Sequence, residues 1–171
     1  MKRFKKTQFE FIALMASLMS IVALSIDALL PALSDIGNVL NIQKTSQAQL
    51  LITMIFLGLG LGQLIAGPLS DSFGRKKVTD VGFAIFIVAS FISATTNSFA
   101  IMILGRILQG IGLAAPRTIS MAIVRDSYEG NQMAKIMSFV AVIFILVPTV
   151  APTIGKVLLD TWGWQSIFFA Q

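Results

Sequence analysis

The stretch from Gly67 to Lys77 reads GPLSDSFGRKK, and it separates two long apolar segments. The preceding segment covers about 46–69 and the following one about 78–96. Each is close to the length of about 20 apolar residues that a helix needs to cross a bilayer. Between them lie a glycine-containing turn and three consecutive basic residues. This pattern predicts two transmembrane helices joined by a short, positively charged connector.

The rest of the chain repeats this pattern and predicts an all-α transmembrane fold. Of the 171 residues, 56% are hydrophobic and 12% are charged, and the mean hydropathy is +0.84. A soluble domain carries about twice that charged fraction, so these values exclude a cytosolic globular domain and a disordered tail. We expect five membrane-spanning helices and the start of a sixth. The expected ranges are 8–33, 46–69, 78–96, 99–124 and 132–159, with a connector at 35–38 and the sixth helix starting at 165–171.

Lysine and arginine are unequally distributed between the two sets of connectors. Nine lie before the first helix or in the connectors after the second and fourth, against two on the opposite side. Cytoplasmic loops of membrane proteins are enriched in these residues. We therefore expect a multi-pass protein of a bacterial-type inner membrane with a cytoplasmic N-terminus. The nine are Lys2, Arg3, Lys5, Lys6, Arg75, Lys76, Lys77, Arg125 and Lys135, and the two are Lys44 and Lys156.

Two ionisable residues, Asp27 and Arg106, lie inside predicted helices, where a charge costs about 2.5 kcal/mol or more. Asp27 precedes the end of the first helix by roughly 9 Å, and Arg106 follows the start of the fourth by roughly 10 Å. Because the two helices run in opposite senses, both groups reach a similar depth. We expect them to line one polar cavity and to influence each other's charge. The alternatives are that Asp27 marks a helix end and that Arg106 is structural.

The predicted fourth helix carries Gln109 one turn after Arg106, which predicts a polar stripe that faces the bundle interior. The second helix carries Gly58, Gly62 and Ala66 at four-residue spacing. Small residues on one face let helices approach closely, so we expect this face to pack against a neighbouring helix.

Histidine and cysteine are both absent from the sequence. Disulfides and thiolate metal sites are therefore excluded, as are the usual general base and the commonest metal ligand. No carboxylate pair is placed across the expected cavity. We expect neither an enzyme nor a metal site, and no nucleic acid partner.

The connector at 67–77 resembles the signature loop of the major facilitator superfamily, in which a glycine, a leucine and an acidic residue precede a second glycine and basic residues. Gly67, Asp71, Gly74 and Arg75 match it, and the loop lies between the second and third helices, where that family has it. Gly74 permits a sharp turn, and Asp71 can pair with Arg75. The resemblance implies that these residues latch the cytoplasmic face. Ser72 stands where the family usually has an arginine.

Further segments resemble motifs of the drug:proton antiporters within that superfamily. They are 27–31 (DALLP) in the first helix, 106–112 (RILQGIG) in the fourth, and 151–155 (APTIG) with Pro148 before it in the fifth. The segments 124–126 and 162–168 also resemble the bicyclomycin-resistance branch of multidrug exporters. Lys156 stands where the fifth-helix motif usually has a second glycine, which puts close packing at that position in doubt.

The resemblance implies proton-driven export of small drug-like molecules by alternating access between two six-helix halves. Asp27 would bind protons or a cationic substrate. Arg106 would modulate this binding at Asp27, with Gln109 as a hydrogen-bonding neighbour of Arg106. The proton gradient is the implied energy source, with no cofactor. The expected partners are a drug-like substrate, protons and the lipid bilayer. The residues that would shape the fifth helix are Pro148, Pro152 and Gly155.

The length of the chain leads to a further expectation. The last apolar run covers only about 10 Å of the ~30 Å hydrocarbon thickness. We therefore expect the N-terminal half of a transporter, for which a separate C-terminal half is one partner. Two alternatives stay open. One is a truncated or split membrane protein that does not transport without a partner half, and the other is a superfamily transporter of another small metabolite.

Overall fold

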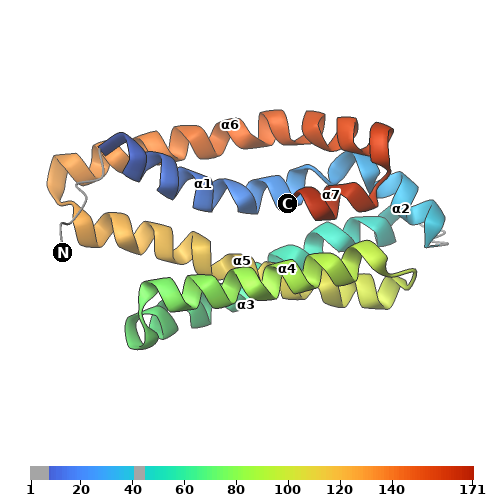
Figure 1. Cartoon of the computed structure of the whole chain (residues 1–171), viewed down its shortest axis with the longest axis horizontal. Coiled ribbons are helices and arrows are strands. Elements are labelled where there is room, and N and C mark those ends of the chain that lie inside the picture. Colours follow the sequence, from blue (N-terminus) through green and yellow to red (C-terminus); the bar gives the residue numbers. More distant parts are fainter. Residues whose placement is uncertain (1–7, 41–44) are drawn as a thin grey trace.

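The computed structural model describes residues 8–40 and 45–171, and this part of the chain is helical apart from short connections (Figure 1). Five helical segments are long and apolar enough to cross a membrane. The expected all-α transmembrane fold with five spans and a short further helix is confirmed. The elements are α1 (Gln8–Asp27), η1 (Leu30–Ala32), α2 (Leu33–Val39), α3 (Thr45–Phe73), α4 (Arg75–Thr95), α5 (Phe99–Ser127), α6 (Gly130–Trp162) and α7 (Gln165–Ala170).

The long helices lie in two layers (Figure 1). One layer contains α1 and α6, and the other contains α3, α4 and α5, while α7 packs against α4 and α6. α5 packs along α3 and α4 in its own layer and also contacts α1 and α6 in the other layer. The apolar part of α5 is 56% buried, against 11–33% for the other spans. The fourth span is therefore the central helix of the bundle.

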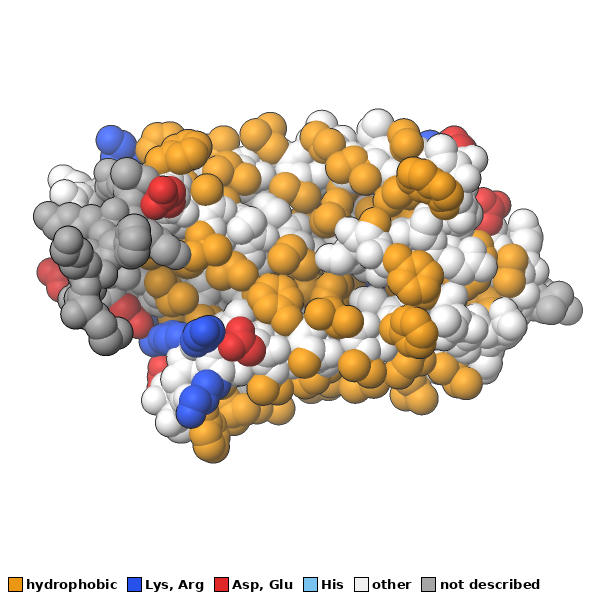
Figure 2. Space-filling view, in the orientation of Figure 1, with side chains coloured by type: hydrophobic (Ala, Val, Ile, Leu, Met, Phe, Trp, Pro, Cys, Tyr) orange, Lys and Arg blue, Asp and Glu red, His pale blue; other side chains and the backbone are white. Residues whose placement is uncertain are grey.

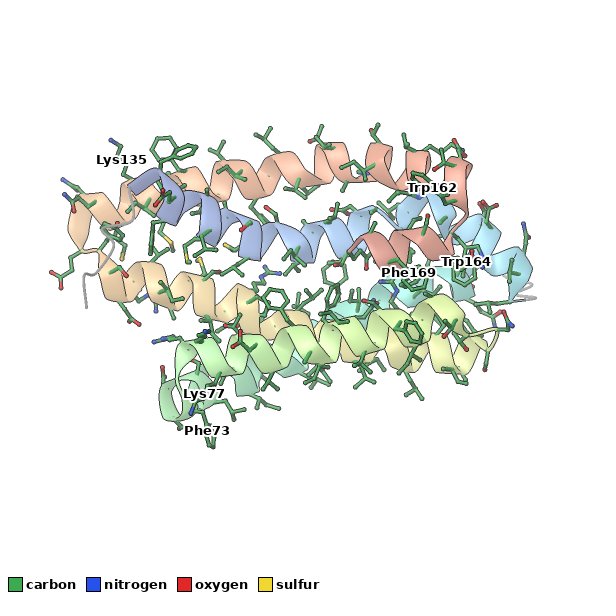
Figure 3. All side chains as sticks on the ribbon, viewed as in Figure 1. Phe73, Lys77, Lys135, Trp162, Trp164 and Phe169 are labelled. Carbon is green, nitrogen blue, oxygen red and sulfur yellow. The ribbon has the colours of Figure 1, made fainter. Side chains whose placement is uncertain are left out.

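Charged and aromatic side chains distinguish the two ends of the bundle. Lysines and arginines gather at one end (Figure 2), where Lys77 and Lys135 both lie, and Trp162 and Trp164 lie at the other (Figure 3). We call these the basic end and the tryptophan end. Five basic residues used above for orientation lie outside the described residues: Lys2, Arg3, Lys5, Lys6 and Lys44.

The first span is broken, although a continuous helix was expected there. Pro31 has no N–H to donate to the carbonyl of Asp27 four residues earlier, so α1 ends at Asp27. One 3-10 turn follows, in which Ala32 donates to the Leu29 carbonyl at 2.9 Å. Proline is favoured in the first turn of a helix, and here a new helical segment starts with it. The expected connector at 35–38 is wrong, because these residues belong to α2.

Two other connections are shorter than the sequence indicated. α3 continues to Phe73, so Gly74 alone separates it from α4. Gly74 has φ of +93°, a left-handed conformation that favours glycine, which confirms its expected role in a sharp turn. Two residues, Tyr128 and Glu129, join α5 to α6.

Glycines allow α3 and α5 to pack closely. A Cβ atom at Gly58 would overlap the backbone carbonyl of Ile107, and one at Gly62 would lie 2.6 Å from the Cβ of Ala114. Ala66, the third small residue of this face, is 6% exposed. The expectation that this face packs against a neighbouring helix is confirmed.

We predict that Gly58→Ala lowers the free energy of unfolding by about 1–3 kcal/mol, because the new methyl group meets backbone atoms that cannot move aside. Gly60→Ala on the same helix is the matched control, since a Cβ there meets no atom within 4 Å. Thermal unfolding of the two variants in detergent micelles measures the difference. Equal melting temperatures would contradict the close α3–α5 packing.

Candidate functional site

Arg106 of α5 lies in the interior of the bundle and is 1% exposed. Its Nη1 donates to Oε1 of Gln109 at 3.0 Å and to the backbone carbonyl of Ser25 at 3.4 Å. Its guanidinium group also lies over the ring of Phe168, 4.7 Å from the ring centre, in a cation–π contact. Three elements, α1, α5 and α7, thus hold one buried cation.

The Ser25 carbonyl is available to Arg106 because α1 ends two residues later. In a continuous helix this carbonyl would accept the N–H of Leu29. The last α-helical bond of α1 instead runs from Ala28 to Leu24, which leaves the Ser25 carbonyl outside the backbone ladder. The side-chain amide of Gln171 donates to the same carbonyl at 3.5 Å. The break in the first span therefore creates the acceptor that the buried arginine uses.

Gln109 is fully buried and connects Arg106 to α4. Its Nε2 donates to the hydroxyl of Ser90 at 2.6 Å, and its Oε1 accepts from Arg106. Sequence reasoning placed Gln109 beside Arg106 but missed Ser90 and Phe168. A single serine in an apolar helix gives no signal, and Phe168 was noted only as part of a resemblance.

Asp27 and Arg106 do not form an ion pair. In the described part of the chain, no lysine or arginine nitrogen lies within 4.0 Å of the Asp27 carboxylate, and this residue is half-buried. Asp27 is nevertheless two residues from the carbonyl that binds Arg106. The structure therefore brings the two residues to the same level of the bundle, with the backbone of α1 linking them.

Two polar atoms of this cluster have no hydrogen-bond partner in the described part of the chain. They are Nε and Nη2 of Arg106. Leaving a buried donor unsatisfied costs about 1–3 kcal/mol. Two adjacent donors of one guanidinium group form a fork that suits a carboxylate. The site thus has unused capacity to bind an anionic group.

Arg75 holds together three helices at the basic end. Its Nη2 lies 3.1 Å from Oδ1 of Asp71 in α3 and 2.9 Å from Oδ2 of Asp126 in α5. The pair with Asp71 was expected, whereas the pair with Asp126 was missed. Gly67 lies one turn earlier, where its carbonyl accepts the Ser70 hydroxyl at 2.8 Å. A Cβ at Gly67 would meet nothing within 4 Å, so no side-chain contact requires a glycine there.

The three residues of the fifth-helix motif lie within α6. Pro148 and Pro152 each remove a backbone donor, so two carbonyls one turn earlier lose their helical partners. Gly155 is buried, and a Cβ there would overlap the carbonyl of Ala28. Lys156 is exposed and forms an ion pair within α6, so it leaves the close contact of Gly155 intact. This contact seats α6 directly against the break in the first span.

A groove of about 410 Å³ lies between α1 and α6. Its size falls within the range of pockets that bind drug-sized molecules, about 300–1,000 Å³. Its hydroxyl groups come from Ser17 and Ser20, and the Ser20 oxygen is buried without a hydrogen-bond partner in the described chain. The remaining lining is apolar: Ile21, Leu24, Ile143, Leu146, Val147, Val150, Ala151 and Ile154.

Comparison with known proteins identifies the family, because residues 15–171 match the Major Facilitator Superfamily. The chain belongs to this superfamily. It is 32% identical over 165 residues to the Bicyclomycin resistance protein homolog of Haemophilus influenzae. It is 31% identical over 171 residues to the Multidrug resistance protein MdtL of Salmonella paratyphi C. These alignments cover 96% and 100% of this chain but 41% of each relative.

Membership of the Major Facilitator Superfamily makes this chain a multi-pass membrane protein of a transporter family, and not an enzyme. The match includes the connector at 67–77, the first span from residue 15 onward with its break, and the whole of α5 and α6. The chain spans about two fifths of the length of these two relatives.

We predict that Asp126→Asn lowers the free energy of unfolding by up to about 1 kcal/mol, the usual range for exposed ion pairs. The loss should shrink in concentrated salt, which already screens the pair. Asp80→Asn is the control, because Asp80 is an exposed aspartate of α4 with no ion pair in the described chain. Thermal unfolding of the two variants is measured at low and high salt. Equal melting temperatures of Asp126→Asn and Asp80→Asn at low salt would show that the ion pair contributes no stability.

Proposed function

We propose that this bundle forms half of a proton-coupled multidrug exporter, which exchanges protons for drug-like molecules by alternating access. The observation that carries the proposal is the position of Asp27 at the break in the first span, beside the carbonyl that binds the buried Arg106. A carboxylate and a buried cation at one level of the membrane provide a pair whose interaction depends on protonation. The names of the relatives, which refer to bicyclomycin and multidrug resistance, support the drug-like substrate.

In the proposed cycle, Arg106 exchanges partners as Asp27 gains and loses its proton. The ionised carboxylate of Asp27 suits the unpartnered fork of Nε and Nη2 on Arg106. Protonation removes the charge of the carboxylate and weakens that pair. Arg106 then keeps the Ser25 carbonyl and Gln109 as its acceptors, as in this structure. Each exchange changes the link between α1 and α5.

The groove between α1 and α6 supports the apolar character of the substrate. Its lining is apolar except for two serines, so it favours a molecule with little polar surface. A transporter of a strongly polar metabolite would need more hydrogen-bonding groups than this groove offers. We therefore place the apolar part of the substrate along α1 and α6.

We further propose that the basic end is cytoplasmic and that transport requires a second bundle. The first statement follows from the enrichment of lysine and arginine in cytoplasmic loops. The second follows from the relatives, in which the aligned region is 41% of the length. In this arrangement Arg75, with Asp71 and Asp126, would latch the cytoplasmic face against the second bundle.

We predict that Asp27→Asn abolishes proton-dependent drug efflux, because the amide cannot bind and release a proton. The chain is expressed in a drug-sensitive bacterial host together with the C-terminal half of a multidrug-resistance relative. Efflux of a fluorescent drug is followed with and without a proton uncoupler. Asp35→Asn is the matched control, since Asp35 is an exposed aspartate of the same span.

Efflux that survives in the Asp27→Asn variant, or that persists after the proton gradient collapses, would overturn the proposed coupling. Expression of the chain without a second bundle tests whether it transports on its own. Efflux from the chain alone would contradict the requirement for a partner bundle, and efflux only on co-expression would support it.

A further inference from the structure

We propose that Ser90 of α4 is a positioning residue that fixes the buried Arg106 by orienting the amide group of Gln109. The inference rests on the proposed function for its consequence in transport, but its structural part is independent of transport. It assigns a role to a residue of the third span, which none of the motifs above includes.

The direction of the hydrogen bonds leaves one arrangement for Gln109. A guanidinium group has donors and no acceptor, so the amide must face Arg106 with its oxygen. Oε1 accepts from Nη1 of Arg106 at 3.0 Å, which turns the amide nitrogen toward α4. That nitrogen needs an acceptor, and the hydroxyl oxygen of Ser90 lies 2.6 Å away.

The side chains of this network are buried, and Ser90 also lines the wall of a pocket of about 140 Å³. Ser90 is 6% exposed, Gln109 is 0% exposed and Arg106 is 1% exposed. The packing of α4 on α5 also fixes the distance, because a Cβ at Gly105 would overlap the hydroxyl of Ser93. Ser90 is therefore the acceptor that a closely packed neighbouring helix brings to the Gln109 amide.

Removal of the Ser90 hydroxyl would leave the amide nitrogen of Gln109 buried without an acceptor. A buried donor without a partner is unfavourable, so the amide would rotate to find another one. Its oxygen would then leave Arg106, and the Ser25 carbonyl, at 3.4 Å, would be the remaining acceptor of Nη1. The guanidinium group would lose the contact that fixes its orientation relative to α4.

The test uses the 171-residue chain in detergent micelles, with arginine labelled by nitrogen-15. The NMR signals of the Arg106 side chain are assigned from the signals that Arg106→Lys removes. Hydrogen bonds and burial should slow both the rotation of the guanidinium group and the exchange of its protons with water. We expect Ser90→Ala to speed this exchange by up to about tenfold, as loss of one hydrogen bond would. Ser90→Thr, which keeps the hydroxyl, should restore slow exchange.

Ser93→Ala is the matched control. Ser93 lies one turn further along α4 and is 0% exposed, and its hydroxyl has no hydrogen-bond partner in the described chain. Its removal should leave the Arg106 signals unchanged. Unchanged signals in Ser90→Ala, or an equal change in Ser93→Ala, would overturn the proposal.

A double-mutant cycle tests whether Ser90 acts through Gln109. Gln109→Ala alone should speed exchange at Arg106, and adding Ser90→Ala should cause no further change. Additive effects would overturn the proposed route. The pH profile of efflux in the Ser90→Ala variant, measured in the co-expression assay above, separates this inference from the proposed function. Altered Arg106 signals with an unaltered pH profile would support the positioning role of Ser90 and refute the role of Arg106 in proton coupling.

Discussion

The structure depends on a buried arginine that donates a hydrogen bond to the backbone of a broken helix. A guanidinium group inside a membrane protein needs acceptors, and the carbonyls of a continuous transmembrane helix are already bonded along the helix. The first span breaks just before Pro31, so Leu29 does not donate to the Ser25 carbonyl, and this carbonyl accepts from Arg106 instead. The same interruption puts Asp27 at the end of α1. The acceptor and the carboxylate thus have one local cause.

Close packing around α5 buries this polar cluster. Gly58 and Gly110 bring α3 and α5 into backbone contact, and Gly82 and Gly112 do the same for α4 and α5. With side chains at these positions, the helices would stand further apart and the interior would admit water. In a water-excluded interior, hydrogen bonds and charges interact more strongly than in solvent. The glycines of three helices therefore help to set the electrostatic environment of Arg106, although none of them binds it.

Much of the fold follows from the sequence, and less of the site does. The lengths of the apolar segments predicted the five spans, and Gly74 predicted the turn between the second and third spans, because each of these features depends on local sequence alone. Asp27, Arg106 and Gln109 were found because polar residues in apolar helices are conspicuous. The Ser25 carbonyl was missed because backbone atoms leave no mark in a sequence. Ser90 and Asp126 were missed because their importance comes from neighbours on other helices.

The central position of α5 has a consequence for how the chain enters the bilayer. α5 is the least apolar of the five spans and carries three arginines, Arg106, Arg117 and Arg125. A lone helix with such residues partitions poorly from the translocon into lipid. Its glycines contact α3 and α4, and the backbone acceptor of Arg106 lies at the end of α1, so these partners precede α5 in the chain, while Phe168 of α7 follows it. We therefore expect the preceding helices to stabilise the fourth span in the bilayer before α7 completes the cluster.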